Sequence, residues 1–186
     1  SAARHGARTC LIQDRPVLGG NASSEVRVTV HGAACHHPGA RETGIVMEAL
    51  NAERRANHLF PIENGWTNSV HDLALYNMAV EQENLTLHLN TSVQDVRLSD
   101  GRWGRESLAE WPVATDENGY LLRPSCHPDQ PARVSAIKAT VANAETEIIF
   151  AAETFIDCTG DALLAHLAGC EWRMGSESRE ETGEIH

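Results

Sequence analysis

The stretch Ser1-Ala-Ala-Arg-His-Gly-Ala-Arg-Thr-Cys-Leu-Ile-Gln-Asp-Arg15 decides the fold. Its first residues are typical of the last turns of a helix, and Gly6 suits a C-cap because glycine accepts left-handed backbone dihedrals. Residues 9–13 form a short apolar run with a polar end, which is typical of a buried parallel strand. A helix, a glycine and a strand in this order predict part of a βαβ unit, and therefore an α/β fold with a parallel sheet.

The helix before Gly6 has no start signal of its own in this sequence. We therefore expect the chain to be an internal fragment of a domain that is truncated at both ends, with a strand and a turn upstream of residue 1.

Further elements follow from the spacing of apolar residues. Alternation predicts strands, a three- to four-residue spacing predicts helices, and Asn68 with Ser69 suits a helix N-cap. The predicted strands are 26–30, 85–89, 93–98, 134–141, 147–150 and 154–158, with 134–150 as a hairpin, and the predicted helices are 42–56, 69–83 and 162–168.

Residues 102–132 have no clear period and hold four of the seven prolines and two of the four tryptophans. We interpret them as an inserted β-rich or irregular region. The domain would then comprise residues 1–101 and continue over residues 133–186. The acidic tail after Glu177 is typical of a solvated segment.

Composition excludes several classes of protein. The 186 residues are 41% hydrophobic, which is enough for a globular core, and the formal charge of −11 argues against nucleic acid as a partner. No apolar run approaches the roughly 18 residues that cross a bilayer, and the first residues do not resemble a secretion signal. We expect a cytoplasmic protein with no membrane partner.

The five cysteines are odd in number, scattered, and form no C-x-x-C pair. They predict neither a disulfide framework nor an iron-sulfur site. Cys10 and Cys158 lie in apolar runs, and we expect them to be small buried residues.

Three loops follow predicted strands, where the ligands of parallel α/β sheets bind. They are residues 13–15, the glycine-containing residues 18–24, and residues 157–161. Taken alone, the second is an ordinary turn and the third an ordinary strand-to-helix connection with Asp161 as N-cap.

Together, the segments L-I-Q-D-R at 11–15, L-G-G-N-A-S-S at 18–24 and F-I-D-C-T-G-D-A-L-L-A at 155–165 resemble the FAD-dependent oxidoreductase family. These are two-dinucleotide-binding-fold flavoproteins with heterodisulfide-reductase-A-like and thiazole-biosynthesis-like relatives. The resemblance runs from residue 1 to about residue 175. It implies a Rossmann-like FAD/NAD(P)-binding domain with bound FAD, and the G-x-G-x-x-G turn of such domains would lie upstream of this chain.

At the end of the first strand, the resemblance implies that Gln13 or Asp14, together with Arg15, meets the adenosine ribose. Family members usually have Glu where this chain has Gln13.

In residues 18–24, the resemblance implies that Gly19, Gly20 and Asn21 lie along the pyrophosphate and ribityl chain. Ser23 and Ser24 would then approach the isoalloxazine ring.

Farther along the chain, Val93 matches a position whose backbone receives the adenine. Thr159, Gly160 and Asp161 match the second FAD motif, in which the aspartate holds a ribityl hydroxyl.

A histidine-rich segment is the other candidate site. His31, Cys35, His36 and His37 lie within seven residues, although two of them are adjacent and cannot easily face one ion. The segment is interpreted as a metal site, an active-site loop beside the flavin, or a surface loop, and we assign no metal.

Arg27 and His31 are the candidate catalytic residues, because they could hold a substrate anion or move a proton if this segment faces the flavin. His71 and Asp72 open the second predicted helix, and the helix dipole alone explains Asp72 there.

The expected activity is hydride or two-electron transfer through FAD, with the substrate and the electron acceptor left open. Two alternatives stay open. The chain could be a noncatalytic nucleotide-binding or interaction module, or part of an iron-sulfur-linked electron-transfer flavoprotein whose cluster ligands lie outside this sequence.

Overall fold

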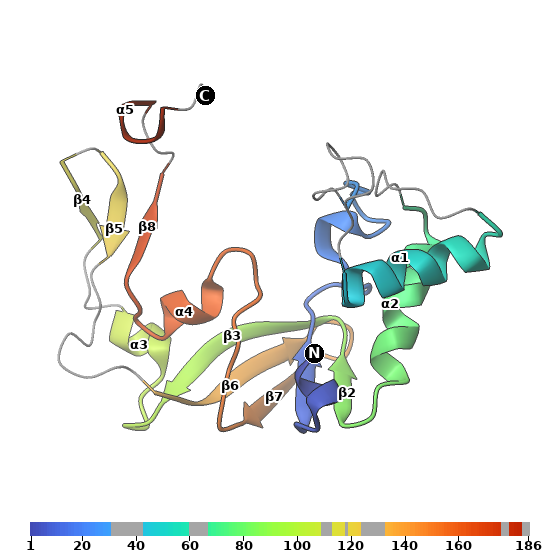
Figure 1. Ribbon diagram of the computed structural model, residues 1–186. Coiled ribbons are helices and arrows are strands. Elements are labelled where there is room, and N and C mark those ends of the chain that lie inside the picture. The colour runs from blue at the N-terminus through green and yellow to red at the C-terminus, as the bar shows by residue number, and fades with distance from the viewer. Residues whose placement is uncertain are drawn as a thin grey trace. The chain divides into compact units, whose positions relative to one another are not determined.

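The protein has a mixed α/β structure, shown as a computed structural model in Figure 1. It describes residues 1–30, 43–59, 67–108, 113–117, 119–123, 133–175 and 179–183. The chain forms two compact units, of which the first comprises Ser1–Ser92 with Val141–Ala144 and the second comprises Val93–Thr140 with Glu145–His186.

The first unit begins with the predicted helix, glycine and strand. A single 3-10 turn, η1 (Ala2–His5), ends at Gly6, which has a φ of 89° and donates its N–H to the carbonyl of Ala3 at 3.0 Å. Strand β1 (Thr9–Ile12) follows and pairs in parallel with β2 (Leu85–His88). The predicted order and the parallel pairing are confirmed.

Two helices complete the first unit, α1 (Ile45–Ala56) and α2 (Val70–Val80), and they pack against each other. Both were predicted, and α2 ends three residues earlier than expected. The side chain of Asn68 caps α2 by accepting the N–H of Val70 at 2.9 Å, whereas Ser69 forms no capping hydrogen bond. The buried apolar side chains on these helices are alanines, which let the backbones approach closely: Ala49, Ala74 and Ala79.

The second unit contains two three-stranded sheets. One has the order β3-β6-β7, from β3 (Thr91–Leu98), whose first two residues belong to the first unit, β6 (Val134–Val141) and β7 (Thr146–Ala151). A turn over residues 142–145 joins β6 to β7, which confirms the predicted hairpin.

The other sheet is antiparallel and joins β4 (Ala114–Thr115), β5 (Leu121–Arg123) and β8 (Trp172–Met174). Three short helices belong to the same unit: α3 (Gly104–Leu108), α4 (Leu163–Leu167), which was predicted, and α5 (Arg179–Thr182). Within the described residues, parallel pairing is therefore limited to β1 and β2. The predicted insertion at residues 102–132 stays a prediction.

The predicted strand at 26–30 is wrong. The carbonyl of Ser23 accepts the N–H groups of Val26 and Arg27 at 3.3 and 2.8 Å, and Val28 donates to the carbonyl of Asn21 at 2.8 Å. These bonds turn the backbone onto its own loop, so the alternating valines do not belong to a sheet, and Val26 is 60% exposed.

The predicted strand at 154–158 is also wrong, because β7 ends at Ala151 and residues 154–158 belong to no strand. The side chain of Asp157 instead binds backbone groups farther along the chain, a local alternative that competes with strand pairing.

The expectation of buried cysteines is wrong where the structure describes them. Cys10, Cys158 and Cys170 are free and exposed. Strand β1 is likewise not buried as expected, since Leu11 is 36% exposed beside Cys10. The reason is that a two-stranded sheet with short strands covers little of its own surface.

None of the helices in the described ranges is long and apolar enough to cross a membrane.

Gly104 should be intolerant of a side chain. A Cβ at this position would collide with the carbonyl oxygen of Leu167 and lie 2.8 Å from Cγ2 of Val96. We expect Gly104→Ala to lower the free energy of unfolding by about 1–3 kcal/mol, measured by urea denaturation. Gly101→Ala is the control, because its Cβ would meet nothing within 4 Å and only its positive φ of 90° is penalised. Equal losses in the two variants would contradict the predicted collision.

Candidate functional site

The ends of β1 and β2 lie side by side at the carboxyl edge of the parallel pair. Gln13 donates its N–H to the carbonyl of His88 at 2.8 Å and accepts the N–H of Thr91 at 2.9 Å. Asn90 then donates to the carbonyl of Arg15 at 3.1 Å. The structure therefore places Gln13 and Arg15 where ligands of parallel α/β sheets bind.

Arg15 closes the loop that leaves this edge. Its guanidinium donates from Nε and Nη2 to the carboxylate of Glu25 at 2.9 and 2.8 Å. The hydrogen bond and the charge of Arg15 lower the pKa of Glu25 below its ordinary value. A planar bidentate pair of this kind fixes orientation, so both ends of the loop between Arg15 and Glu25 are held together.

The two glycines of the loop have different surroundings. Gly19 and Gly20 have φ angles of 113° and 54°, and their carbonyls accept the N–H groups of Ala22 and Ser23, each at 3.0 Å. A Cβ on Gly19 would lie 3.0 Å from Cδ1 of Leu75, whereas a Cβ on Gly20 would meet nothing within 4 Å. Gly19 therefore allows the loop to approach α2, and Gly20 leaves its backbone open to a ligand.

The two serines that follow the glycines are placed differently, and the start of α2 holds the second of them. Ser23 is fully buried. The carboxylate of Asp72 accepts the N–H of Ser24 at 3.0 Å and also its hydroxyl. The prediction that the helix dipole alone explains Asp72 is thus wrong. Asp72 also anchors the loop by binding Ser24, which is far from it in the sequence.

Arg27, a candidate catalytic residue, lies at the end of the same loop. It has a φ of 62°, which is rare for a residue with a side chain, and its Nη2 donates to Oγ of Ser69 at 2.8 Å. No carboxylate in the described ranges forms an ion pair with Arg27. The other candidate, His31, lies outside the described residues, as do Cys35, His36 and His37.

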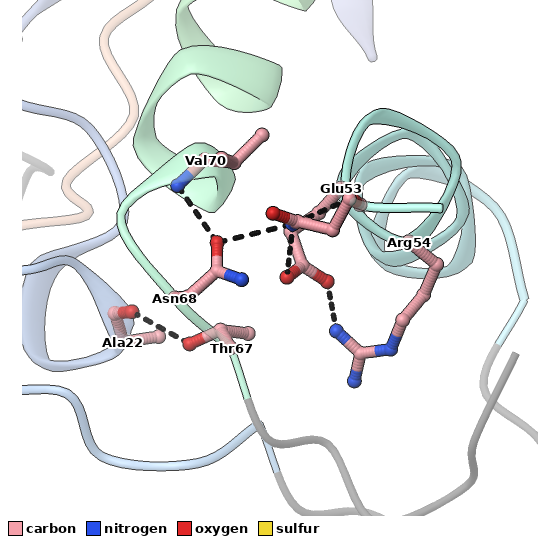
Figure 2. Close-up of polar contacts among 7 residues, drawn as sticks. Ala22, Glu53, Arg54, Thr67, Asn68 and Val70 are labelled. Carbon is pink, nitrogen blue, oxygen red and sulfur yellow. Dashed lines mark hydrogen bonds and ion pairs between the residues drawn. The ribbon is translucent and has the colours of Figure 1, made fainter. Parts of the chain in front are cut away.

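A buried polar network connects α1 to the start of α2 (Figure 2). Glu53 and Arg54 are 1% and 3% exposed and form an ion pair with each other. Nδ2 of Asn57 donates to Oε1 of Glu53 at 3.0 Å and to Oδ1 of Asn68 at 3.2 Å. The sequence does not indicate this network, because charged residues on an amphipathic helix normally mark a solvated face.

His71 is a second buried ionisable group in this region. It is 4% exposed, and its Nδ1 has no hydrogen-bond partner among the described residues. Burial lowers the pKa of His71, and the charge of Arg54 lowers it further, while Asp72 acts in the opposite direction. The surroundings of His71 therefore favour the neutral form of its imidazole.

In the second unit, Asp157 organises the predicted second motif. Its carboxylate accepts the N–H and the hydroxyl of Thr159 at 2.9 and 2.8 Å and the N–H of Ala165 at 3.0 Å. The hydroxyl of Thr159 in turn accepts the N–H of Leu163 at 3.0 Å. Asp157 and Thr159 thus cap the first turn of α4.

The other predicted residues of the second unit have fewer constraints. Gly160 and Asp161 are exposed, and the N-cap position of α4 is Ala162, so the interpretation of Asp161 as the N-cap is wrong. Val93 is half-buried on β3.

The described ranges contain no group of three or more His, Cys, Asp or Glu side chains that could hold a metal ion.

The profile of the FAD dependent oxidoreductase family matches residues 1–185, almost the whole chain. The chain therefore belongs to this family of flavoproteins, whose cofactor is FAD and whose chemistry is oxidoreduction. No curated protein and no solved structure matches the chain.

The Asp157 cap should show a defined pH dependence. Burial by itself would raise the pKa of Asp157, but the hydrogen bonds from Thr159 and Ala165 outweigh it and lower the pKa below the ordinary value. The stabilisation is therefore complete above about pH 4 and is lost as the pH falls through the lowered pKa. Asp157→Asn should cost about 1 kcal/mol at pH 7 in urea unfolding, with Asp161→Asn as control. A loss in Asp157→Asn that is unchanged at pH 3 would count against this cap.

His71 should make the first unit sensitive to mild acid. Because its pKa is lowered in the folded state, the unfolded chain binds more protons below about pH 6.5, and stability decreases as the pH falls below that value. We expect His71→Gln to flatten the decrease in the urea midpoint between about pH 7 and pH 5. His5→Gln, an exposed histidine of the same unit, should leave the decrease as it is. An equal decrease of the urea midpoint with pH in His71→Gln and in wild type would refute this role of His71.

Proposed function

We propose that this chain is a Rossmann-like FAD-binding domain of an oxidoreductase that exchanges two electrons, as hydride, with a small-molecule substrate. The observation that carries the proposal is the turn at Gly19 and Gly20, which follows the carboxyl end of a parallel strand pair and leaves open space beside Gly20. This arrangement fits a dinucleotide, because backbone N–H groups can approach a pyrophosphate only where no side chain intervenes.

Gln13 or Asp14, at the end of β1, would bind the adenosine ribose. Arg15, which is engaged with Glu25, would set the shape of this segment. A neutral Gln13 accepts fewer strong hydrogen bonds from a ribose diol than the glutamate usual in the family, so Asp14 is the better candidate for the charged acceptor.

Gly19, Gly20 and Asn21 would lie along the pyrophosphate and ribityl chain. Ser24 would lie toward the isoalloxazine, and its contacts with Asp72 support a fixed backbone at that point. Ser23, which was expected there too, is fully buried and would support the loop from beneath.

In the second unit, the backbone of Val93 would receive the adenine. Thr159, Gly160 and Asp161 would contact the ribityl chain. The support for this motif is that Asp157 fixes the turn while Asp161 is exposed and available for a hydroxyl.

Bound FAD supplies the two-electron chemistry, and the protein supplies orientation and electrostatics. Arg27 is the residue that we propose for holding a substrate anion. Its guanidinium contacts the neutral hydroxyl of Ser69, and no carboxylate of the described residues forms an ion pair with it. His31 is proposed as a group that moves a proton.

The experiment is to add FAD to the purified protein, remove free FAD by desalting, and record the visible spectrum. Wild type should retain flavin absorbance. Gly20→Ala should weaken FAD binding roughly tenfold or more, because a Cβ would enter the open space, while unfolding free energy falls by only about 1 kcal/mol from the positive φ.

Gly101→Ala is the matched control, since it has the same kind of backbone strain, and it should keep wild-type FAD affinity. Normal FAD affinity in Gly20→Ala would mean that the loop is not the cofactor site. Wild type that retains no flavin would favour the noncatalytic nucleotide-binding or interaction module.

A further inference from the structure

We propose that Glu53, Asn57 and Asn68 form a positioning relay that holds the glycine loop, defined as residues 19–28, in the shape that accepts a ligand. The relay rests on the proposed FAD-binding role of this loop. Glu53 lies on α1, Asn57 is its C-cap and Asn68 lies just before α2, so all three are outside the segments that would touch the cofactor.

Burying Glu53 and Arg54 has a free-energy cost. Their side chains are almost completely removed from water, and the pKa of Arg54 is lowered by its burial. A buried ion pair is a weak stabiliser compared with apolar side chains of similar volume, because both ions lose their hydration. The pair is better explained by the geometry that it imposes than by its contribution to stability.

Hydrogen bonds connect this buried pair to the start of α2. Nδ2 of Asn57 donates to Oε1 and to the backbone carbonyl of Glu53 at 3.0 and 2.9 Å, and it contacts Oδ1 of Asn68 at 3.2 Å. Oδ1 of Asn68 also accepts the N–H of Val70 at 2.9 Å. Glu53 therefore sets, through Asn57 and Asn68, the backbone position at which the chain enters α2.

The entry segment of α2, defined as residues 67–72, holds the glycine loop at three points. Thr67 donates its hydroxyl to the carbonyl of Ala22 at 3.4 Å. The two further contacts join Ser69 to Arg27 and Asp72 to Ser24. A shift of the entry segment would therefore displace all three contacts together, and the loop with them.

The test uses Asn57→Ala, which removes the link in the middle of the relay but leaves the buried ion pair in place. In the protein without FAD, we expect the amides of Ala22, Arg27 and Val28 to exchange with solvent roughly tenfold faster. The amides in β1 and β2 should keep their wild-type exchange rates. FAD affinity should fall about fivefold.

Glu48→Gln is the matched control, because Glu48 is another arginine-bound carboxylate of α1 that is exposed and contacts Arg4 instead of the loop. It should change neither loop exchange nor FAD affinity. Thr67→Val combined with Asn57→Ala should weaken FAD binding by less than the product of the two single effects, because both act through the same segment.

Unchanged exchange of the loop amides in Asn57→Ala, or equally faster exchange across β1 and β2, would overturn the relay. This result does not depend on cofactor binding. Wild-type protein that retains no FAD would instead refute the proposed function, while the exchange measurement still decides the relay.

Discussion

The parallel pairing of β1 with β2 is the constraint on which the first unit depends. It aligns Thr9 with Leu85 and Ile12 with His88, so that two strand ends from distant parts of the sequence meet at one edge. Parallel strands require a long crossover connection, and here that connection carries the glycine loop, α1 and α2. The pairing therefore decides where the loop begins and which helix it can contact.

The glycine loop gains its shape from charge placement more than from apolar packing. The Arg15–Glu25 pair closes it, Asp72 holds Ser24, and buried Glu53 acts at a distance through amide side chains. Charged hydrogen bonds are directional, whereas burial of alanines is not, so they can define one backbone conformation. For a family whose cofactor performs the chemistry, such orientation is the main contribution that the protein can make.

In the second unit, too, hydrogen bonds to a carboxylate fix a backbone turn. Asp157 and Thr159 satisfy backbone N–H groups at the first turn of α4, and Asp157 does so from a segment that the sequence pattern favours as a strand. Side-chain capping at this point fixes the turn over Thr159 and Gly160 without a neighbouring strand. The predicted second FAD motif is thus also a local structural motif.

The sequence by itself determined the elements whose signals are local. Gly6 marked a helix end, the apolar runs marked β1, β2 and the hairpin, periodicity marked α1, α2 and α4, and the combined loop motifs indicated the flavoprotein family. Only the tertiary structure decided that residues 26–30 turn back on their loop, that Asp72 anchors Ser24, and that Glu53 is buried. The physical reason is that these outcomes depend on hydrogen bonds and desolvation between residues far apart in the chain, which no local pattern of side chains encodes.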